Sequence, residues 1–199
     1  MTHNIILRIA AASVLAFALI ASSQISHAAS NHALGLSYTS GFGDVVDWHD
    51  NNLLVEDTFD VPIGISYRYI HTFSSGLRMD VGVGPVSLIA GDIEYHDIPA
   101  QLTLGYTFLK SGGFSPYLRG GVVYHINGGD YVKTSADFGL LGALGAEIGK
   151  SRVRFFAEVA VDTAESTFST AEGNQLFVVK NSQEDIAVLD VHFTIGVKF

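Results

Sequence analysis

The chain of 199 residues has no cysteine, few basic residues and no apolar run long enough for a membrane-spanning helix. Without cysteine, a disulfide framework, a thiolate metal site and thiol catalysis are excluded. The 11 basic residues stand against 20 acidic ones, which gives a formal net charge of −9. Nucleic acids and anionic membrane surfaces attract basic patches, so this charge argues against either as a partner.

Residues 1–28 have the pattern of a cleavable signal peptide. Arg8 precedes an apolar run over residues 9–20, and Ser26-His27-Ala28 places small residues at the two positions that a signal peptidase reads. The run is shorter than the roughly 20 residues that cross a hydrocarbon core, so an uncleaved anchor is the less favoured alternative. We expect cleavage after residue 28, with Ala29 as the neighbouring choice, and a single domain over residues 29–199.

The mature chain alternates apolar and polar residues in segments of strand length. Side chains alternate between the two faces of a strand, and the last segment carries an apolar residue at each odd position up to Phe199. Each segment is close to the 9–11 residues, roughly, that a tilted membrane strand needs. The predicted strands cover residues 32–40, 60–71, 77–86, 100–108, 117–126, 138–148, 153–162 and 190–199.

The connections also alternate, between short turns and long loops. Short turns are expected at residues 73–76, 110–113 and 150–152, and long, acidic loops at 41–58, 87–97, 127–136 and 163–186. Tight turns at one end and long loops at the other are typical of outer-membrane barrels. Because a closed barrel also leaves no unpaired edge at the terminal strand, the sequence predicts an all-β, eight-stranded antiparallel up-and-down transmembrane barrel.

Periodicity alone does not say which face is inside, since a soluble barrel such as a lipocalin alternates in the same way. The polar face here is rich in Gly, Ser and Thr, with a few charges of both signs, whereas a solvated exterior is usually rich in Lys and Glu. Eight strands enclose an interior that side chains nearly fill. We therefore expect the polar face inside and the apolar face against lipid.

Residues 97–124 carry a family resemblance. Pro99 leads into a strand that ends Tyr106-Thr107-Phe108, and Pro116-Tyr117 opens a Gly-rich strand. This stretch is similar to the central hairpin of the outer-membrane protein W family, from which it departs at Ala100, Arg119 and Val123. The resemblance implies an eight-stranded barrel whose apolar channel is proposed to pass small hydrophobic compounds toward the membrane. It carries over no catalytic residue.

Elsewhere the similarity is the general pattern shared with OmpA-like membrane domains. The aromatic C-terminal residue, Phe199, resembles the end of bacterial outer-membrane barrels, where that residue belongs to the assembly signal. The resemblance therefore implies the barrel-assembly machinery, periplasmic chaperones and outer-membrane lipid as partners. No cofactor and no metal are expected.

Charged residues on the polar face form the main candidate site. We expect them to pair within the lumen, since buried charges are tolerated mainly when paired. The expected network is Arg68, Arg78, Asp80, Arg119, Glu147, Arg154, Glu158, Asp162, Asp190 and His192, with Lys198 on the same face.

An acid–base site is the less favoured alternative for this face. It would pair His192 or His125 with Glu147 or Glu158, because histidine titrates near neutral pH. Barrel lipid A deacylases resemble this fold and use a His-x-Ser-Asn segment, but His125-Ile126-Asn127 lacks the serine. We therefore expect no enzymatic activity.

Two loop-edge segments place an aromatic residue and a histidine between acids. They are Asp47-Trp48-His49-Asp50 and Glu94-Tyr95-His96-Asp97. If the two loops met, these residues could bind a divalent ion. The pattern favours an interfacial aromatic belt over that ion site.

Three prolines mark a possible weak point of the wall. Pro62, Pro85 and Pro99 fall in or beside three consecutive strands, and proline gives no N–H to a ladder. One hypothesis is a side opening between the third and fourth strands near Pro85 and Pro99. The alternative is that Pro62 and Pro99 begin their strands and Pro85 marks a bulge.

The favoured function is a bacterial outer-membrane barrel that binds or passes small hydrophobic compounds. The runner-up is an OmpA-like surface protein that adheres through its acidic loops or stabilises the envelope. A lipid-modifying enzyme is the third alternative.

Overall fold

The computed structural model describes residues 29–53, 63–89, 95–109, 112–133, 138–150, 152–172, 176, 178–187 and 191–199. The predicted signal peptide, Pro62 and Asp190 lie outside these ranges. Among the described residues, no helix has the length and apolar character needed to cross a membrane.

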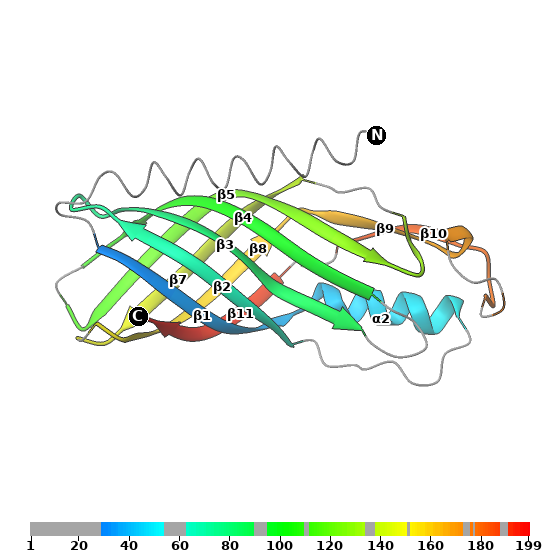
Figure 1. Ribbon diagram of the computed structural model, residues 1–199, viewed down its shortest axis with the longest axis horizontal. Coiled ribbons are helices and arrows are strands. Elements are labelled where there is room, and N and C mark those ends of the chain that lie inside the picture. Colours follow the sequence, from blue (N-terminus) through cyan, green and yellow to red (C-terminus); the bar gives the residue numbers. More distant parts are fainter. Residues whose placement is uncertain are drawn as a thin grey trace.

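Eight of the described strands close into an antiparallel barrel (Figure 1). Around the barrel their order is β1 (Ala29–Thr39), β11 (Val191–Lys198), β8 (Arg154–Asp162), β7 (Phe138–Ile148), β5 (Phe114–Gly129), β4 (Tyr95–Thr107), β3 (Leu77–Ile89) and β2 (Ile63–Thr72). The first and last barrel strands, β1 and β11, close the ring, and His32 and Phe199 exchange two backbone hydrogen bonds of 2.8 Å at this seam. The predicted eight-stranded all-β barrel is confirmed.

The apolar face of the alternation is the outer face. On β11, Phe193 and Ile195 are 52% and 67% exposed, whereas Thr194 between them is buried. The Thr194 hydroxyl lies 2.7 Å from the Ser37 hydroxyl of β1, inside the barrel. The same arrangement holds on β1, where Leu36 is exposed and Ser37 is buried. A lipocalin-like barrel, with its apolar face inward, is therefore excluded.

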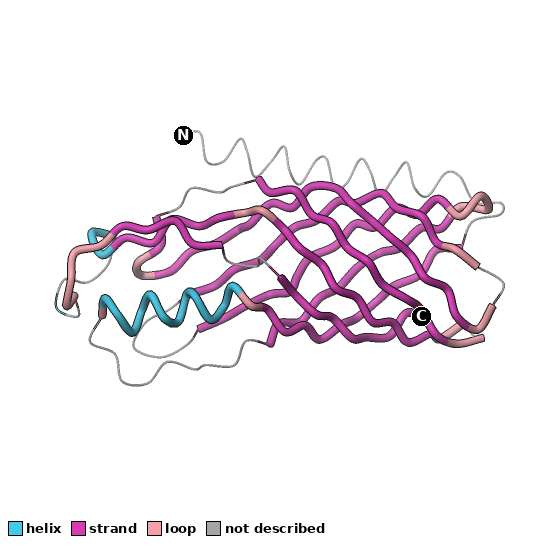
Figure 2. The backbone as a smooth tube through the Cα atoms, turned by 180° about the vertical axis from the view of Figure 1, so that it is seen from behind, coloured by secondary structure: helices cyan, strands magenta, loops and turns pink. Residues whose placement is uncertain are grey.

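The two ends of the barrel differ, as Figures 1 and 2 show. At the end that holds the C-terminus the links are tight, and between β2 and β3 the Phe73 amide donates to the Leu77 carbonyl over 2.8 Å. We call this the turn end. The opposite end carries folded structure, which we call the cap. The cap consists of α2 (Gly41–Asn52), β6 (Val132–Lys133), β9 (Glu165–Ser169), η1 (Thr170–Glu172) and β10 (Gln183–Ala187).

The cap has a hydrophobic core of its own. Its short strands form a sheet in the order β10-β9-β6, and Leu53 after α2 bridges to Val178. Helix α2 turns Val45, Trp48 and His49 inward, at the three-to-four-residue spacing of one helix face. The buried core residues are Val45, Val46, Trp48, Leu53, Tyr95, Tyr131, Val132, Phe168 and Ile186.

The cap corrects two expectations from the sequence. Residues 41–58, 127–136 and 163–186 were predicted as loops, and the structure places α2, β6, β9 and β10 within them. Trp48 and Tyr95 were expected in an interfacial belt, but they are 3% and 2% exposed within the cap core. The physical reason is packing, because both rings contact Phe168, with centroid distances of 5.4 and 5.5 Å.

The predicted bounds of the loop at residues 87–97 are wrong, because β3 extends to Ile89 and β4 begins at Tyr95. Ser87 pairs with Asp97 and Ile89 with Tyr95, beyond a register shift that begins after Val83. Gly84 lies at this bulge with φ +103°, and a Cβ there would stand 2.6 Å from the Ile65 carbonyl oxygen. A bulge changes which residues face inward, so the alternation read from the sequence was lost here.

Candidate functional site

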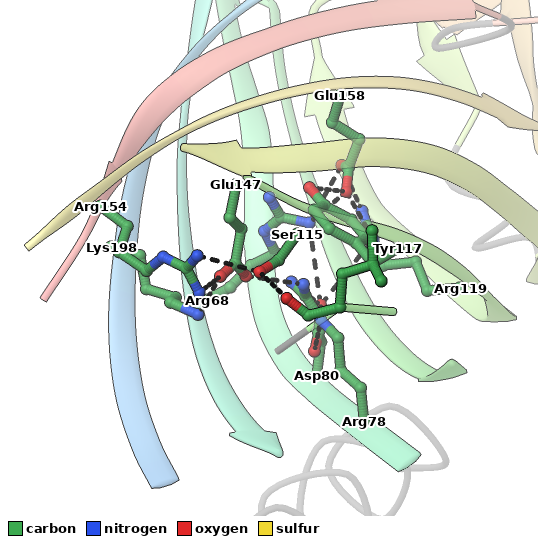
Figure 3. A network of polar contacts seen from close by, with 11 residues as sticks. Arg68, Arg78, Asp80, Ser115, Tyr117, Arg119, Glu147, Arg154, Glu158 and Lys198 are labelled. Carbon is green, nitrogen blue, oxygen red and sulfur yellow. Dashed lines mark hydrogen bonds and ion pairs between the residues drawn. The ribbon is translucent and has the colours of Figure 1, made fainter. Parts of the chain in front are cut away.

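The centre of the barrel is filled by ion pairs around Glu158 of β8 (Figure 3). Arg68 of β2 approaches its carboxylate at 2.8 Å and Arg119 of β5 at 2.7 Å. Tyr117 donates its hydroxyl hydrogen to the same carboxylate over 2.9 Å. Charge-assisted hydrogen bonds of this length are the strong class in proteins. Strands on three sides of the barrel are therefore tied together across the lumen.

A second group surrounds Glu147 of β7, nearer the turn end. Arg78 donates to it over 3.0 Å, Arg154 lies 3.4 Å away, and Lys198 also contacts it. Arg78 also holds Asp80 at 2.7 Å, and its guanidinium stacks 3.9 Å from the Tyr117 ring centroid. Tyr117 thus links the Glu158 and Glu147 groups. We refer to both groups together as the inner network.

Space for the inner network comes from glycines on the neighbouring strands. Tyr117 pairs in register with Gly145 of β7. A Cβ at Gly145 would stand 2.5 Å from the Tyr117 ring and hydroxyl. The small residues of the polar face therefore make room for large side chains from the strand beside them.

A second polar layer lies between the inner network and the cap. His125 of β5 contacts the Asp97 carboxylate at 3.0 Å through Nδ1, and its Nε2 lies 3.7 Å from Asp162 of β8. His192 of β11 faces inward on the same side of the barrel, and all four side chains are buried. We call these four residues the cap-side cluster. The lining of the barrel is polar here as well.

Most of the predicted lumen residues are brought together. Asp162 and His192 belong to the cap-side cluster, Asp190 lies outside the described residues, and the other seven form the inner network with Lys198. The alternative acid–base pairs are not formed. Glu147 and Glu158 are bound by arginines, and His125 is held by Asp97 instead.

Asp97 and Tyr117 are two of the lumen residues that the sequence reading missed. Asp97 was assigned to a loop, although extending the alternation of Gln101 and Thr103 back by two residues at a time places it on the inward face. Tyr117 is an aromatic residue on a polar face, and its role follows only from the cross-lumen distance to Glu158.

The predicted side opening coincides with the β3 bulge. Pro85 lies buried within the bulge, and Pro99 is buried and pairs with His125 of β5. Gln101 of β4 spans the irregular region by donating to the Gly84 carbonyl over 2.6 Å. Any opening at this place therefore requires the Gln101 bridge to break.

The cap contains an acidic pocket between α2 and β10. It has a volume of about 500 Å³. Four of the lining side chains are acidic, and Lys180 is basic. The lining consists of Asp44, Asp47, Trp48, Asn51, Asn52, Lys180, Ser182, Glu184, Asp185 and Ile186. In the part of the chain that the structure describes, no cluster of three or more His, Asp or Glu side chains is placed to hold a metal ion.

His49 sits behind this pocket, on the buried side of α2. Burial lowers the pKa of His49, although its Nδ1 lies 2.7 Å from the Val45 carbonyl oxygen. Its ring packs at right angles to Trp48, with centroids 5.4 Å apart. The cap core therefore favours neutral His49.

The fold and the inner network define a small barrel with an apolar exterior, a lumen filled with paired charges and a folded cap. The chain matches no protein-family model and no curated protein. Among solved structures it is similar to the outer membrane protein OprG from Pseudomonas aeruginosa, with a TM-score of 0.57 and 15% identity over 87% of this chain and 98% of OprG. Neisserial surface protein A (NspA) aligns with a TM-score of 0.48 and 13% identity, over 87% of this chain and 98% of NspA. The likeness to OprG shows the fold, and membership of the W family stays a prediction.

Proposed function

We propose that this chain is a bacterial outer-membrane barrel that is closed to solutes and acts at the cell surface through its cap. The apolar outer face supports a membrane location, because exposed side chains such as Leu104 (59%) and Ile195 (67%) would be unfavourable in water. The turn end faces the periplasm in this proposal, and the cap faces outward. Export by the signal peptide and insertion by the barrel-assembly machinery belong to the same proposal.

The observation that carries the proposal is the inner network. The sequence favoured passage of hydrophobic compounds, yet the residues that line the lumen are charged and joined across it, as Arg68 and Arg119 are to Glu158. An apolar solute would have to displace these buried ion pairs and leave their charges without partners, which is strongly unfavourable. The geometry therefore favours the runner-up function, a surface-binding barrel.

Uptake into liposomes tests the proposal. Purified protein refolded into liposomes should take up a hydrophobic fluorescent tracer no faster than protein-free liposomes do. Saturable uptake above that background would overturn the closed barrel. If such uptake also stopped when a disulfide joined Val86→Cys and Ala100→Cys across the bulge, the solute would leave through the side opening near Pro85 and Pro99.

A further inference from the structure

We infer that the rim of the barrel at the turn end binds the headgroups of anionic phospholipids. Two neighbouring turns form this surface, between β4 and β5 and between β7 and β8, over the described residues of 108–113 and 149–154. We call it the basic rim. The inference rests on the membrane location that belongs to the proposed function, and it does not depend on a closed lumen.

The exposed charges are separated along the barrel axis. At the turn end, the exposed Lys, Arg, Asp and Glu side chains that the structure describes are Lys150 and Arg152, and both are basic. The acidic side chains nearest to this end, Asp80 and Glu147, are buried and paired within the inner network. The net charge of −9 argued against an anionic surface as a partner, yet the acids of α2, β9 and β10 that contribute to it lie on the cap, at the other end. Salt screens charges beyond roughly 8 Å, so the local charge of the rim governs what binds there.

Hydrogen bonds between the two turns hold the basic rim in shape. The Gly149 amide donates to the Gly113 carbonyl over 2.8 Å, and the Arg154 guanidinium donates to the Gly112 carbonyl over 3.1 Å. The Lys150 side chain lies across Gly113, where a Cβ would stand 3.2 Å from the Lys150 Cε. A surface ordered in this way loses little conformational freedom when a ligand binds.

The positive charge of the basic rim is not neutralised by the described acids. Lys150 and Arg152 have no acidic partner in the described part of the chain. Arg154 beside them lies 3.4 Å from Glu147, a carboxylate that two further basic side chains contact at shorter distances (Figure 3). A phosphate group supplies the missing counter-charge, and guanidinium and ammonium groups both bind phosphate.

An apolar row on the outer face meets the basic rim and favours a lipid as the source of that phosphate. Phe114 of β5 pairs in register with Ile148 of β7, which pairs in turn with Phe155 of β8. All three side chains point outward, with exposures of 52%, 56% and 65%. An acyl chain can pack against this row while its headgroup reaches the bases of the adjoining turn, whereas a soluble phosphate would use the charges alone.

Quenching of tryptophan fluorescence by brominated phospholipids tests the inference. Phe155→Trp places a reporter in the apolar row, and Trp48, the single tryptophan of the chain, is 3% exposed in the cap and gives a constant background. In phosphatidylcholine liposomes, brominated phosphatidylglycerol should quench the reporter more than the same mole fraction of brominated phosphatidylcholine. The expected enrichment is about fivefold for each base that contacts the headgroup. Lys150→Gln combined with Arg152→Gln should remove the excess quenching.

Two matched controls locate the effect. Leu77→Trp places a reporter at the same end of the barrel on the opposite wall, where the turn over residues 73–76 carries no charged residue. The two brominated lipids should quench that reporter equally. Lys180→Gln removes an exposed basic charge from the cap and should leave the excess quenching of the Phe155→Trp reporter unchanged.

Three results would overturn the inference. They are equal quenching of the Phe155→Trp reporter by the two lipids, which would leave the basic rim to a soluble anionic partner, the same excess at Leu77→Trp, or the same loss with Lys180→Gln as with the rim variants. Failure of the proposed function gives different results. A reporter that neither brominated lipid quenches would refute the membrane location, and uptake of the tracer would refute the closed lumen while the lipid preference persists.

Discussion

The inner network and the cap use acidic residues in opposite ways. Within the barrel, Glu158 and Glu147 are each contacted by more than one basic side chain and are almost fully buried. On the cap, Asp47 and Glu184 are exposed and have no basic partner among the described residues. When a buried carboxylate is neutralised, its basic partners remain buried without a counter-charge. When an exposed carboxylate without a partner is neutralised, no buried charge is left unpaired. The same residue type therefore holds the fold in the barrel, whereas on the cap it is exposed and has no basic partner among the described residues.

The largest expected effect follows from neutralising Glu158. Glu158→Gln leaves the guanidinium groups of Arg68 and Arg119 buried without their shared carboxylate, which should lower the free energy of unfolding by about 3–5 kcal/mol. Urea unfolding of the refolded barrel, followed by its heat-modifiable gel band, measures this change. The matched cap variant Glu165→Gln should stay within about 0.5 kcal/mol of the parent. Equal urea midpoints for the two variants would show that the carboxylates of the barrel and of the cap contribute equally to stability, which would contradict the comparison.

The next prediction tests which face of β11 meets lipid. Phe193→Arg should impair insertion at a cost of about 2–4 kcal/mol if the residue lies at mid-bilayer, because a charge on the lipid face is unfavourable there. Phe193→Leu keeps an apolar side chain and serves as the control. Folding yield in liposomes measures the effect. Normal insertion of the arginine variant would place the apolar face inside and the charges outside.

Tyr117 offers a finer measure of the inner network. Tyr117→Phe removes one hydroxyl donor to Glu158 and keeps the ring that stacks on Arg78. A hydrogen bond to a charged group contributes about 1.5–3 kcal/mol, so this variant should lose less stability than Glu158→Gln. The same urea titration compares them. A loss as large as that of Glu158→Gln would mean that the ring position, and not the carboxylate, organises the network.

The smallest effect concerns the cap at low pH. Because the folded pKa of His49 is lowered, the folded cap binds fewer protons than the unfolded chain, so its stability is full above about pH 6.5 and is lost as the pH falls below that value. Acidification from pH 8 to pH 5 should speed hydrogen exchange in α2 while the barrel amides stay protected. His49→Phe should remove this pH dependence. Equal acid sensitivity of α2 in that variant would show that another group is responsible.

The sequence predicted the barrel because its strands alternate regularly. Leu102, Leu104 and Tyr106 face outward, and Gln101 and Thr103, which alternate with the two leucines, are buried, as expected. The prediction failed where regularity ends. The bulge at Gly84 changes the inward set of β3, so residues 87–89 read as loop.

The cap was missed for a different reason. Its core joins segments that lie far apart in sequence, such as Val45, Tyr131 and Phe168. Strands β6 and β9 have only two and five residues, too few to show a pattern of their own, and the twelve residues of α2 were read as part of a long acidic loop. The alternation of the strands predicted which charged side chains face the lumen, but not which of them form ion pairs with one another. The pairing of Arg68 with Glu158 crosses the barrel and depends on distances that a sequence does not contain.

Ion conductance tests the central claim most directly. In planar lipid bilayers at 100 mV, the account predicts that the parent barrel inserts without stable current steps, because the inner network from Arg68 to Glu147 occupies the lumen. The protein is delivered by fusing proteoliposomes with the planar bilayer, and the heat-modifiable band of protein from the same proteoliposomes verifies insertion. Reproducible, long-lived conductance steps from the parent protein would contradict a closed barrel and restore passage through the lumen as its function.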